Sequence, residues 1–316
     1  MGEDDVTIVL ERPTAIAGQL LEGSICFFLK SETSCDGVQL RFTGNERILV
    51  RQSAGETTSD ITAKHRLVDQ SVPLDVSALI VQGKIAAGEH TVPFKVDLPA
   101  HLPASMKVTG NNDSYCQVLY ELKAELSGSG VFRNYKTSKV VRVRSLGGLS
   151  PDPLPYTTNP PVTDKLYSCG FIPRRGDIAV AAHVPDTTLE VGRGRATVAV
   201  ACRNKSTASI HSVTARLVEK THWNANGPDE WQRTILQESE FPGLDGLVSA
   251  NTTDEDLMRQ VAEATNKVDL IVPNGCLNTY DGKLIKVTHA VEIEFRTNQL
   301  TSNPILSIPV DCGDCE

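Results

Sequence analysis

The stretch from Gly88 to Ser105, GEHTVPFKVDLPAHLPAS, constrains the fold more than any other part of the chain. Between residues 90 and 98 apolar and polar side chains alternate, which predicts a strand with one buried face. Pro93 has no N–H to give to a neighbouring strand, so we expect this strand at a sheet edge or with that position facing away from a partner strand. Pro99 and Pro103 fix φ and hold the residues before them extended. The stretch therefore excludes a helix and predicts a strand with a stiff exit.

Runs of the same alternation recur along the chain and predict further strands. Gly44 and Asn45 predict a bulge or turn inside one of them, and the small polar residues 52–60 predict an exposed loop. The predicted strands span residues 6–10, 20–29, 38–50, 116–126, 131–135, 140–144, 178–184, 197–202, 210–219, 231–236, 285–295 and 305–310.

One segment of the second half has a helical period instead. Thr252 and Glu255 have the spacing of a capping box, and apolar residues follow at helical spacing from Leu257 to Ala262. We expect one short helix near residues 253–265, carried in a loop between strands.

The chain of 316 residues is long enough for two domains, each with its own core. Residues 145–164 are rich in Pro and Gly and show neither a helical nor a strand period, which is typical of a domain boundary. We predict an all-β fold of two antiparallel, immunoglobulin-like β-sandwich domains with one short helix in a loop of the second. The predicted boundaries are 1–147 for the N-terminal sandwich, 148–165 for the linker and 166–316 for the C-terminal sandwich.

Charge and hydropathy exclude several classes of protein. The net charge of −8 argues against a nucleic-acid-binding protein, and no run of about 18 apolar residues is present to span a membrane. The acidic start MGEDDV is unlike a secretory signal, so we expect an intracellular protein whose eight cysteines are unpaired thiols.

The histidines and cysteines do not stand at the spacing of a metal or nucleophile site. We therefore predict no catalytic, cofactor or metal site, and we expect His90 and His289 in the core or at a sheet rim. Cys312-Gly313-Asp314-Cys315 is the one chemically suggestive motif. A second pair is missing and the motif lies near a chain end that we expect to fray, so we interpret it as structurally indifferent, with a thiol or metal enzyme as the alternative.

Three smaller motifs are interpreted as surface features. Gly192-Arg193-Gly194-Arg195 and Arg174-Arg175 are predicted to be solvated turns, with contact to an acidic partner or a lipid as the alternative. Tyr156, in Pro153-Leu154-Pro155-Tyr156, is predicted to be a linker tyrosine rather than a docking residue.

Taken together, the chain resembles the arrestin family, and within it the α-arrestin (arrestin-domain-containing) branch more than the visual and β-arrestins. The resemblance lies in the order and spacing of short elements over nearly the whole chain. These are Leu10-x-Arg12-Pro13 with Gly18 and Gly23, Phe42-x-Gly44-x-Glu46, Gly88 to Ser105, Tyr115 to Leu126, Gly192, Asn204-x-Ser206, Ile271-x-Pro273, Leu284-Ile285-x-Val287 and Ile308-Pro309-Val310.

The resemblance implies a non-catalytic intracellular adaptor or scaffold without cofactors. Its partners would be cytoplasmic tails of membrane proteins, or sorting or ubiquitination machinery, in endocytosis, sorting or signalling. It would lie in the cytoplasm, with peripheral association at the plasma membrane or endosomes. A retromer-like coat subunit of arrestin fold is the alternative within this architecture, and an enzyme using Cys312 and Cys315 is the alternative outside it.

Two departures limit what the resemblance implies. Receptor-binding arrestins carry an adjacent pair of lysines in the first strand, whereas residues 6–11 contain no lysine. Many α-arrestins carry Pro-Pro-x-Tyr motifs for ubiquitin ligases, and this chain has none.

Overall fold

The computed structural model describes residues 6–54, 57–128, 135–146, 155–167, 174–225, 227, 229–297 and 303–315. The chain divides into two compact units. The first unit comprises Met1–Leu146 with Trp223–Glu230 and Gly282–Ile285, and the second comprises the rest of the chain. Both units are antiparallel β-sandwiches, so the predicted all-β fold of two sandwich domains is confirmed.

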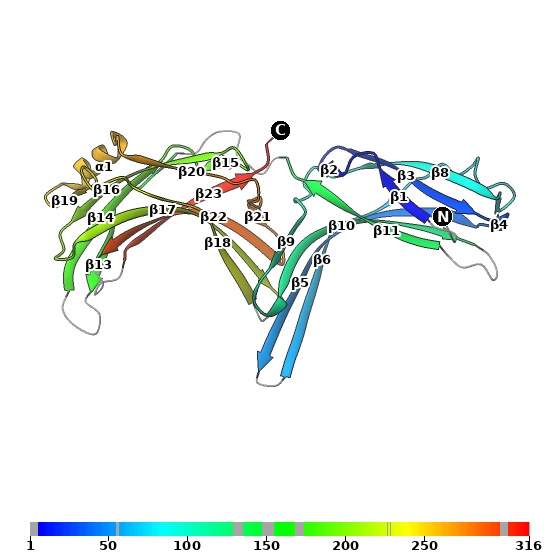
Figure 1. Ribbon diagram of the computed structural model, residues 1–316, viewed down its shortest axis with the longest axis horizontal. Coiled ribbons are helices and arrows are strands. Elements are labelled where there is room, and N and C mark those ends of the chain that lie inside the picture. The colour runs from blue at the N-terminus through cyan, green and yellow to red at the C-terminus, as the bar shows by residue number, and fades with distance from the viewer. Residues whose placement is uncertain are drawn as a thin grey trace. The chain divides into compact units, whose positions relative to one another are not determined.

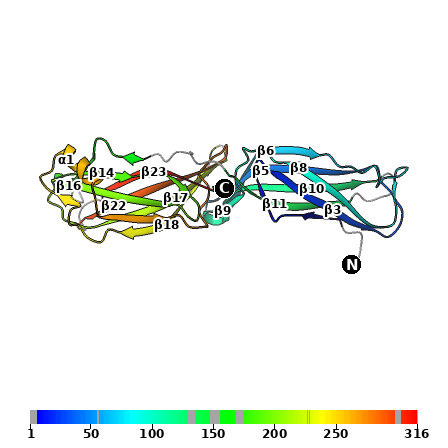
Figure 2. The same ribbon diagram turned by 90° about the horizontal axis from the view of Figure 1, so that it is seen from above.

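The first unit contains two main sheets (Figures 1 and 2). One has the order β1-β3-β8, and the larger has the order β2-β11-β10-β5-β6, with β9 paired to β10. Strands β4 and β7 pair separately. The elements are β1 (Val6–Leu10), β2 (Thr14–Ile16), β3 (Leu20–Leu29), β4 (Thr33–Ser34), β5 (Gly37–Ala54), β6 (Thr57–Val72), β7 (Lys84–Ile85), β8 (Gly88–Asp97), β9 (Met106–Thr109), the 3-10 helix η1 (Asn111–Asp113), β10 (Tyr115–Ser127) and β11 (Tyr135–Arg144).

The second unit also contains two main sheets. One has the order β12-β14-β16-β19 with β13 paired to β14 and β20 paired to β16, and the other has the order β15-β23-β22-β17-β18 with β21 paired to β22. The elements are β12 (Tyr156–Thr157), β13 (Val162–Tyr167), β14 (Arg174–Val184), β15 (Thr188–Glu190), β16 (Arg195–Asn204), β17 (Ile210–Asn224), β18 (Asp229–Glu240), β19 (Val248–Ser249), α1 (Asp254–Ala262), β20 (Lys267–Ile271), β21 (Tyr280–Asp281), β22 (Ile285–Thr297) and β23 (Ile305–Gly313).

The two units share one topology. The order β2-β11-β10-β5-β6 in the first corresponds to β15-β23-β22-β17-β18 in the second, and β1-β3-β8 corresponds to β14-β16-β20. In each unit one short strand pairs in parallel with the last strand. These pairs are β2 with β11 in the first unit and β15 with β23 in the second. The strand order therefore shows one architecture repeated in the two units.

The proline-rich stretch lies where its pattern predicts. Among the described strands β8 pairs only with β3 and lies at the end of its sheet. An edge strand has a side without a partner, which is where a residue that lacks an N–H, such as Pro93, is tolerated. Val92, Phe94 and Val96 are buried and the residues between them are exposed. Pro99 and Pro103 follow in a segment without helix.

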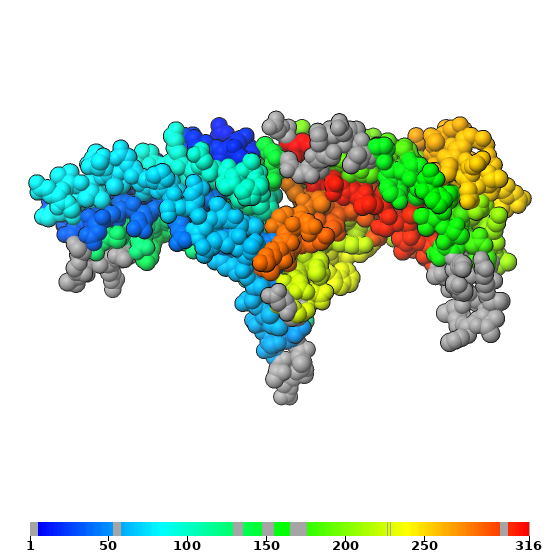
Figure 3. All heavy atoms as spheres, turned by 180° about the vertical axis from the view of Figure 1, so that it is seen from behind, coloured from blue at the N-terminus to red at the C-terminus, as the bar shows by residue number. Residues whose placement is uncertain are grey.

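The predicted loop at residues 52–60 was wrong. Strands β5 and β6 continue into the predicted loop 52–60 and pair as far as Ala54 with Thr57, because backbone hydrogen bonds form a ladder whatever the polarity of the side chains. This paired ribbon extends beyond the body of the first unit (Figures 1 and 3). Parts of the predicted linker form β12 and β13, which pair with β14. Residues 147–154, and 131–134 of a predicted strand, lie outside the described residues.

The one predicted helix is present but begins one residue later than its capping box indicates. Thr253, rather than Thr252, is the N-cap, and its hydroxyl accepts a hydrogen bond from the Asp256 N–H at 3.1 Å. Leu257 and Val261 pack on alanines from the outer face of β14 and β16. Small side chains on that face let the helix approach the sheet closely. No helix in the described ranges is long and apolar enough to cross a bilayer.

Candidate functional site

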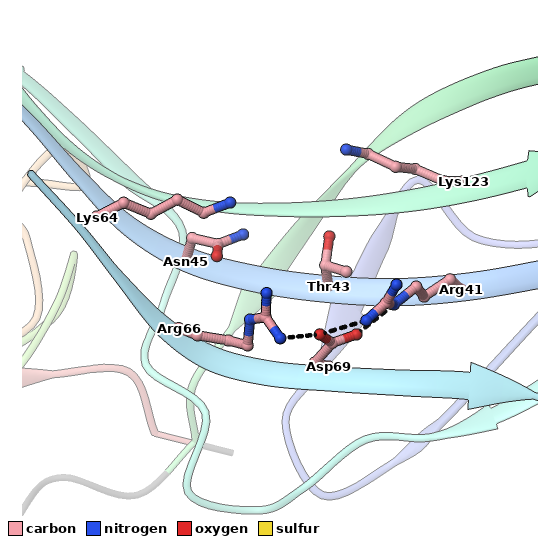
Figure 4. A pocket seen from close by; sticks show the side chains of 7 residues that line it. All are labelled: Arg41, Thr43, Asn45, Lys64, Arg66, Asp69 and Lys123. Atoms are coloured by element: carbon pink, nitrogen blue, oxygen red, sulfur yellow. Dashed lines mark hydrogen bonds and ion pairs between the residues drawn. The ribbon is translucent and has the colours of Figure 1, made fainter.

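A hollow of about 170 Å³ lies on the outer face of the larger sheet of the first unit, over β5, β6 and β10 (Figure 4). We call it the basic hollow. Four cationic side chains and one carboxylate line it, a formal charge of +3 on a chain whose net charge is −8. Its residues are Arg41, Thr43, Asn45, Lys64, Arg66, Asp69 and Lys123.

Strand alternation places these side chains on one face. The even-numbered residues of β5 from Val38 to Val50 are buried, so Arg41 and Thr43 point to the opposite face. Cross-strand register then aligns the neighbours, with Lys123 of β10 opposite Arg41 and Asp69 of β6 opposite Thr43. A register shift between Gly44 and Asn45 keeps Arg66 opposite Asn45. The hollow is therefore built on strands rather than on loops.

Asp69 is held as a charged group by two arginines. Arg41 Nε and an Arg41 terminal nitrogen donate to its carboxylate oxygens at 2.5 and 2.6 Å, and Arg66 forms a second ion pair. These hydrogen bonds, from Arg41 first, lower the pKa of Asp69 below its usual range, and the positive charges of Arg41 and Arg66 lower it further. Asp69 therefore remains ionised at neutral pH and offsets one of the four positive charges.

The two lysines are the least compensated cations of the basic hollow. Within the described ranges Lys64 forms no ion pair, and its side chain is exposed. Lys123 Nζ lies 3.7 Å from Glu121, whose carboxylate accepts a 2.6 Å hydrogen bond from Arg47. In Figure 4 the two ammonium groups point toward one another across the face of the sheet. An anionic group placed between them would meet positive charge on both sides.

A second hollow of about 420 Å³ continues the first across β10 and β11 and shares Arg41 and Lys123 with it. It adds Lys136, whose Nζ lies 3.0 Å from Glu125. From β6 to β11 the surface crosses three interstrand spacings, about 14 Å, which matches about four residues of extended chain. The two hollows together have room for a short extended peptide.

The sequence did not predict this site. Arg41 and Lys123 fall on outward positions of predicted strands, but Lys64 and Arg66 lie in a segment for which we predicted no strand. The site could have been predicted from lysines and arginines at the outward positions of strands that pair with one another. Such a prediction requires knowing that β5 pairs with β10, which places residues about 80 positions apart side by side.

The residues singled out by the sequence lie mostly where we expected. His90 packs beside Phe27 near the rim of its sheet, with 5.2 Å between the two ring centroids. His289 is 3% exposed within the second core. Arg193 and Arg195 are exposed in or beside a turn and pair with neighbouring carboxylates. Tyr156 is half-buried against the second core. The side chains of Arg174 and Arg175 lie outside the described residues.

The expectation of a frayed end was wrong for Cys312. Strand β23 extends to Gly313, so Cys312 is 1% exposed, whereas Cys315 is exposed. All seven described cysteines are free thiols. Cys312 lies beside Cys276 and His289. The two sulfur atoms and an imidazole nitrogen, the atoms that could bind a metal, lie within 4.8 Å of one another. The spacing of these residues in the sequence did not predict this grouping.

The groups of this cluster titrate differently from ordinary thiols. Hydrogen bonds from Cys312 and His289 outweigh burial and lower the pKa of Cys276 to about 6. Burial by itself would lower the pKa of His289, but its hydrogen bonds with Cys276 and Glu219 raise that pKa to about 9. By contrast, burial raises the pKa of Cys202 to about 12. The cluster is therefore chemically distinct from the other buried cysteines.

The comparisons with known proteins agree with the fold. The family model described as Arrestin (or S-antigen), N-terminal domain, matches residues 6–146. The model described as Arrestin (or S-antigen), C-terminal domain, matches residues 193–315. A search of the curated proteins finds no match to this chain. Because the two models together cover most of the sequence in the expected order, the chain belongs to the arrestin family.

Proposed function

We propose that this protein is a non-catalytic adaptor that binds an acidic segment of a partner protein at the basic hollow. Membership of the arrestin family supports an adaptor or scaffold role in general. The partner would be the cytoplasmic tail of a membrane protein or a component of the trafficking machinery, met in the cytoplasm during endocytosis, sorting or signalling. The observation that carries the proposal is the formal charge of +3 in the basic hollow of an acidic chain.

The expected ligand is an extended peptide with carboxylates at alternate positions. Successive side chains of an extended chain point to opposite sides, so acidic residues at alternate positions would all face the sheet. The side chains of Lys64 and Lys123 supply the charge without first having to leave a strong ion pair. Because these lysines are exposed, each contact is weak, and we expect modest affinity that falls with added salt.

The first test is binding of a fluorescent peptide with glutamates at alternate positions, measured by anisotropy at low salt. The double variant K64E/K123E should weaken binding about tenfold, because two weak attractions become repulsions. Lys267→Glu is the matched control, since Lys267 is an exposed lysine on strand β20 of the second unit. Equal weakening in the control, or none in the double variant, would overturn the proposal.

Asp69→Asn is expected to change binding in the opposite direction. The substitution removes the single carboxylate of the basic hollow and leaves Arg41 and Arg66 without their shared partner. We expect about threefold tighter binding of the same peptide. Unchanged or weaker binding would show that the peptide does not respond to charge in the hollow.

The partner class is tested by affinity purification from cell lysate followed by mass spectrometry. The wild-type protein should recover membrane proteins with acidic cytoplasmic tails or sorting machinery, and K64E/K123E should lose them. Anionic vesicles without peptide serve as the comparison. Binding to the vesicles that depends on Lys64 and Lys123, with no peptide binding, would replace the proposed protein partner with a lipid surface.

A further inference from the structure

Three side chains that commonly bind metals meet inside the second unit. Cys276 lies in the loop between β20 and β21, His289 is on β22 and Cys312 is on β23. Cys276 Sγ lies 3.4 Å from His289 Nε2, and all three ligand atoms lie within 4.8 Å of one another. A fourth group, the Glu219 carboxylate of β17, lies 3.4 Å from the same imidazole nitrogen.

We propose that Cys276, His289 and Cys312 bind a zinc ion, with the carboxylate of Glu219 as the fourth ligand. Two thiolates and an imidazole are a ligand set that zinc prefers in proteins, and their softness disfavours magnesium and calcium. All four residues belong to one unit, so the site needs no second domain.

The distances agree with a tetrahedral zinc site. With zinc–sulfur bonds of about 2.3 Å and zinc–nitrogen bonds of about 2.0–2.1 Å, sulfur and nitrogen ligands at tetrahedral angles are about 3.6 Å apart. Nitrogen and oxygen ligands in the same geometry are about 3.4 Å apart. The structure has 3.4 Å for both pairs. The third ligand atom, from Cys312, lies within 4.8 Å of those of Cys276 and His289.

A second layer of hydrogen bonds orients the ligands. The Thr279 hydroxyl lies 3.0 Å from His289 Nδ1 and accepts the Cys312 N–H at 2.8 Å. If Nδ1 carries the imidazole proton and donates it to Thr279, Nε2 presents its lone pair toward Cys276 and Glu219. The Leu277 N–H donates to the Glu219 carboxylate at 2.8 Å, and the Thr279 N–H donates to the Cys312 carbonyl at 2.6 Å. The loop that carries Cys276 is thus attached to the strands that carry the other ligands.

Burial gives a physical reason for an ion at this position. The side chain of His289 has no exposed surface and that of Glu219 is about 10% exposed. A buried carboxylate beside two buried thiols is costly unless opposite charge is nearby, and either a protonated His289 or a bound cation can supply that charge. A divalent ion would supply that charge and would join strands β17, β22 and β23 to the loop. We therefore expect zinc to be bound during folding and to stabilise the second unit.

The test is the zinc content of the full-length protein, purified under reducing conditions, supplied with free zinc and desalted, and measured by plasma mass spectrometry. We expect one zinc per chain. With cobalt instead of zinc, we expect the visible absorption of a tetrahedral site and a near-ultraviolet band from thiolate ligands. Adding a chelator should lower the midpoint of thermal unfolding of the wild-type protein by several degrees.

Variants separate this site from other cysteines. Cys312→Ser should lose both the zinc and the effect of the chelator. Thr279→Val keeps every ligand and should weaken zinc binding about 10- to 100-fold. Two controls should keep the zinc: Cys202→Ser, another buried thiol, and Cys315→Ser, the other cysteine of the Cys-x-x-Cys motif.

Several outcomes would overturn the proposal. One is a folded wild-type protein that takes up neither zinc nor cobalt. Another is a disulfide between Cys276 and Cys312, seen as a loss of about two mass units in protein purified without reductant, together with no zinc in the reduced protein. Loss of zinc in Cys315→Ser but not in Cys312→Ser would place the metal at a different site. Retention of full affinity in Thr279→Val would overturn only the orienting role of this hydroxyl and would leave the four ligands in place.

Discussion

At the scale of single residues, two glycines are explained by aromatic rings on neighbouring strands. Gly44 of β5 lies opposite Tyr120 of β10, and a Cβ at Gly44 would lie 2.4 Å from that ring. Gly23 of β3 lies opposite Phe94 of β8, and a Cβ there would lie 2.4 Å from the Val9 carbonyl oxygen and 2.7 Å from the Phe94 ring. Both glycines belong to the motifs that carry the family resemblance. Gly44 leaves room for the buried Tyr120 ring, and Gly23 leaves room for the Val9 carbonyl group as well as the Phe94 ring.

Gly44→Ala is therefore expected to destabilise the first unit by about 1–3 kcal/mol, because the ring of Tyr120 cannot move away without losing its packing. That ring stacks on Phe42, and its hydroxyl donates to the Pro103 carbonyl at 2.8 Å. Urea unfolding measures the change. Gly37→Ala on the same strand is the control, since nothing lies within 4 Å of the added Cβ. A similar loss in both variants would contradict the proposed steric cause.

At the scale of elements, the sheet β15-β23-β22-β17-β18 of the second unit carries a buried carboxylate between two cations. Glu292 of β22 is 7% exposed, and it accepts hydrogen bonds from Lys220 of β17 at 2.7 Å and from Arg233 of β18 at 2.6 Å. Burial by itself would raise the pKa of Glu292, but the two hydrogen bonds and the two positive charges outweigh burial and lower that pKa. The carboxylate thus joins three adjacent strands.

Glu292→Gln is expected to lower the free energy of unfolding by about 1–2 kcal/mol at pH 7. Because the folded pKa is lowered, this stabilisation is fully present above the unfolded pKa of about 4.3 and is lost as the pH falls through the folded pKa. The difference between wild type and variant should therefore shrink on acidification. Urea unfolding at a series of pH values from 7 to 3 measures it. A constant difference would show that ionisation of Glu292 contributes nothing.

At the scale of the whole molecule, one sandwich topology occurs twice, and each copy carries its own specialised feature. The first unit carries the basic hollow on its outer face, and the second carries the helix α1 and the Cys276, His289 and Cys312 cluster. Each sandwich has its own buried apolar core. Stability and binding are therefore expected to be separable between the two units.

Phe94→Ala is expected to remove about 3–5 kcal/mol from the first unit, since the side chain is 3% exposed and packs over Gly23. Hydrogen exchange measured by mass spectrometry should show faster exchange in β1, β3 and β8. Exchange in β14, β16 and β20 of the second unit should not change. Equal acceleration in both sets of strands would show that the two cores unfold together.

Much of the fold could be predicted because strands with one buried face have a local pattern. The alternation in β3, β8 and β10, and the edge position of Pro93, needed only neighbouring residues and were confirmed. The strands in 52–60 were missed because their residues are polar on both faces, so no alternation marks them. The cap of α1 was misplaced by one residue because Thr252 and Thr253 both precede a run with acidic residues at the right spacing.

The sequence by itself determined that this protein is an all-β member of a two-sandwich family, because the period of two, the prolines and the glycines act over a few residues. Which side chains share a site was decided only by the tertiary structure. Lys64 and Lys123 line one hollow because β5 pairs with both β6 and β10, and Cys276, His289 and Cys312 meet through a loop that closes on two strands. Such contacts join residues tens of positions apart, and strand register, which no local pattern specifies, decides which of them meet.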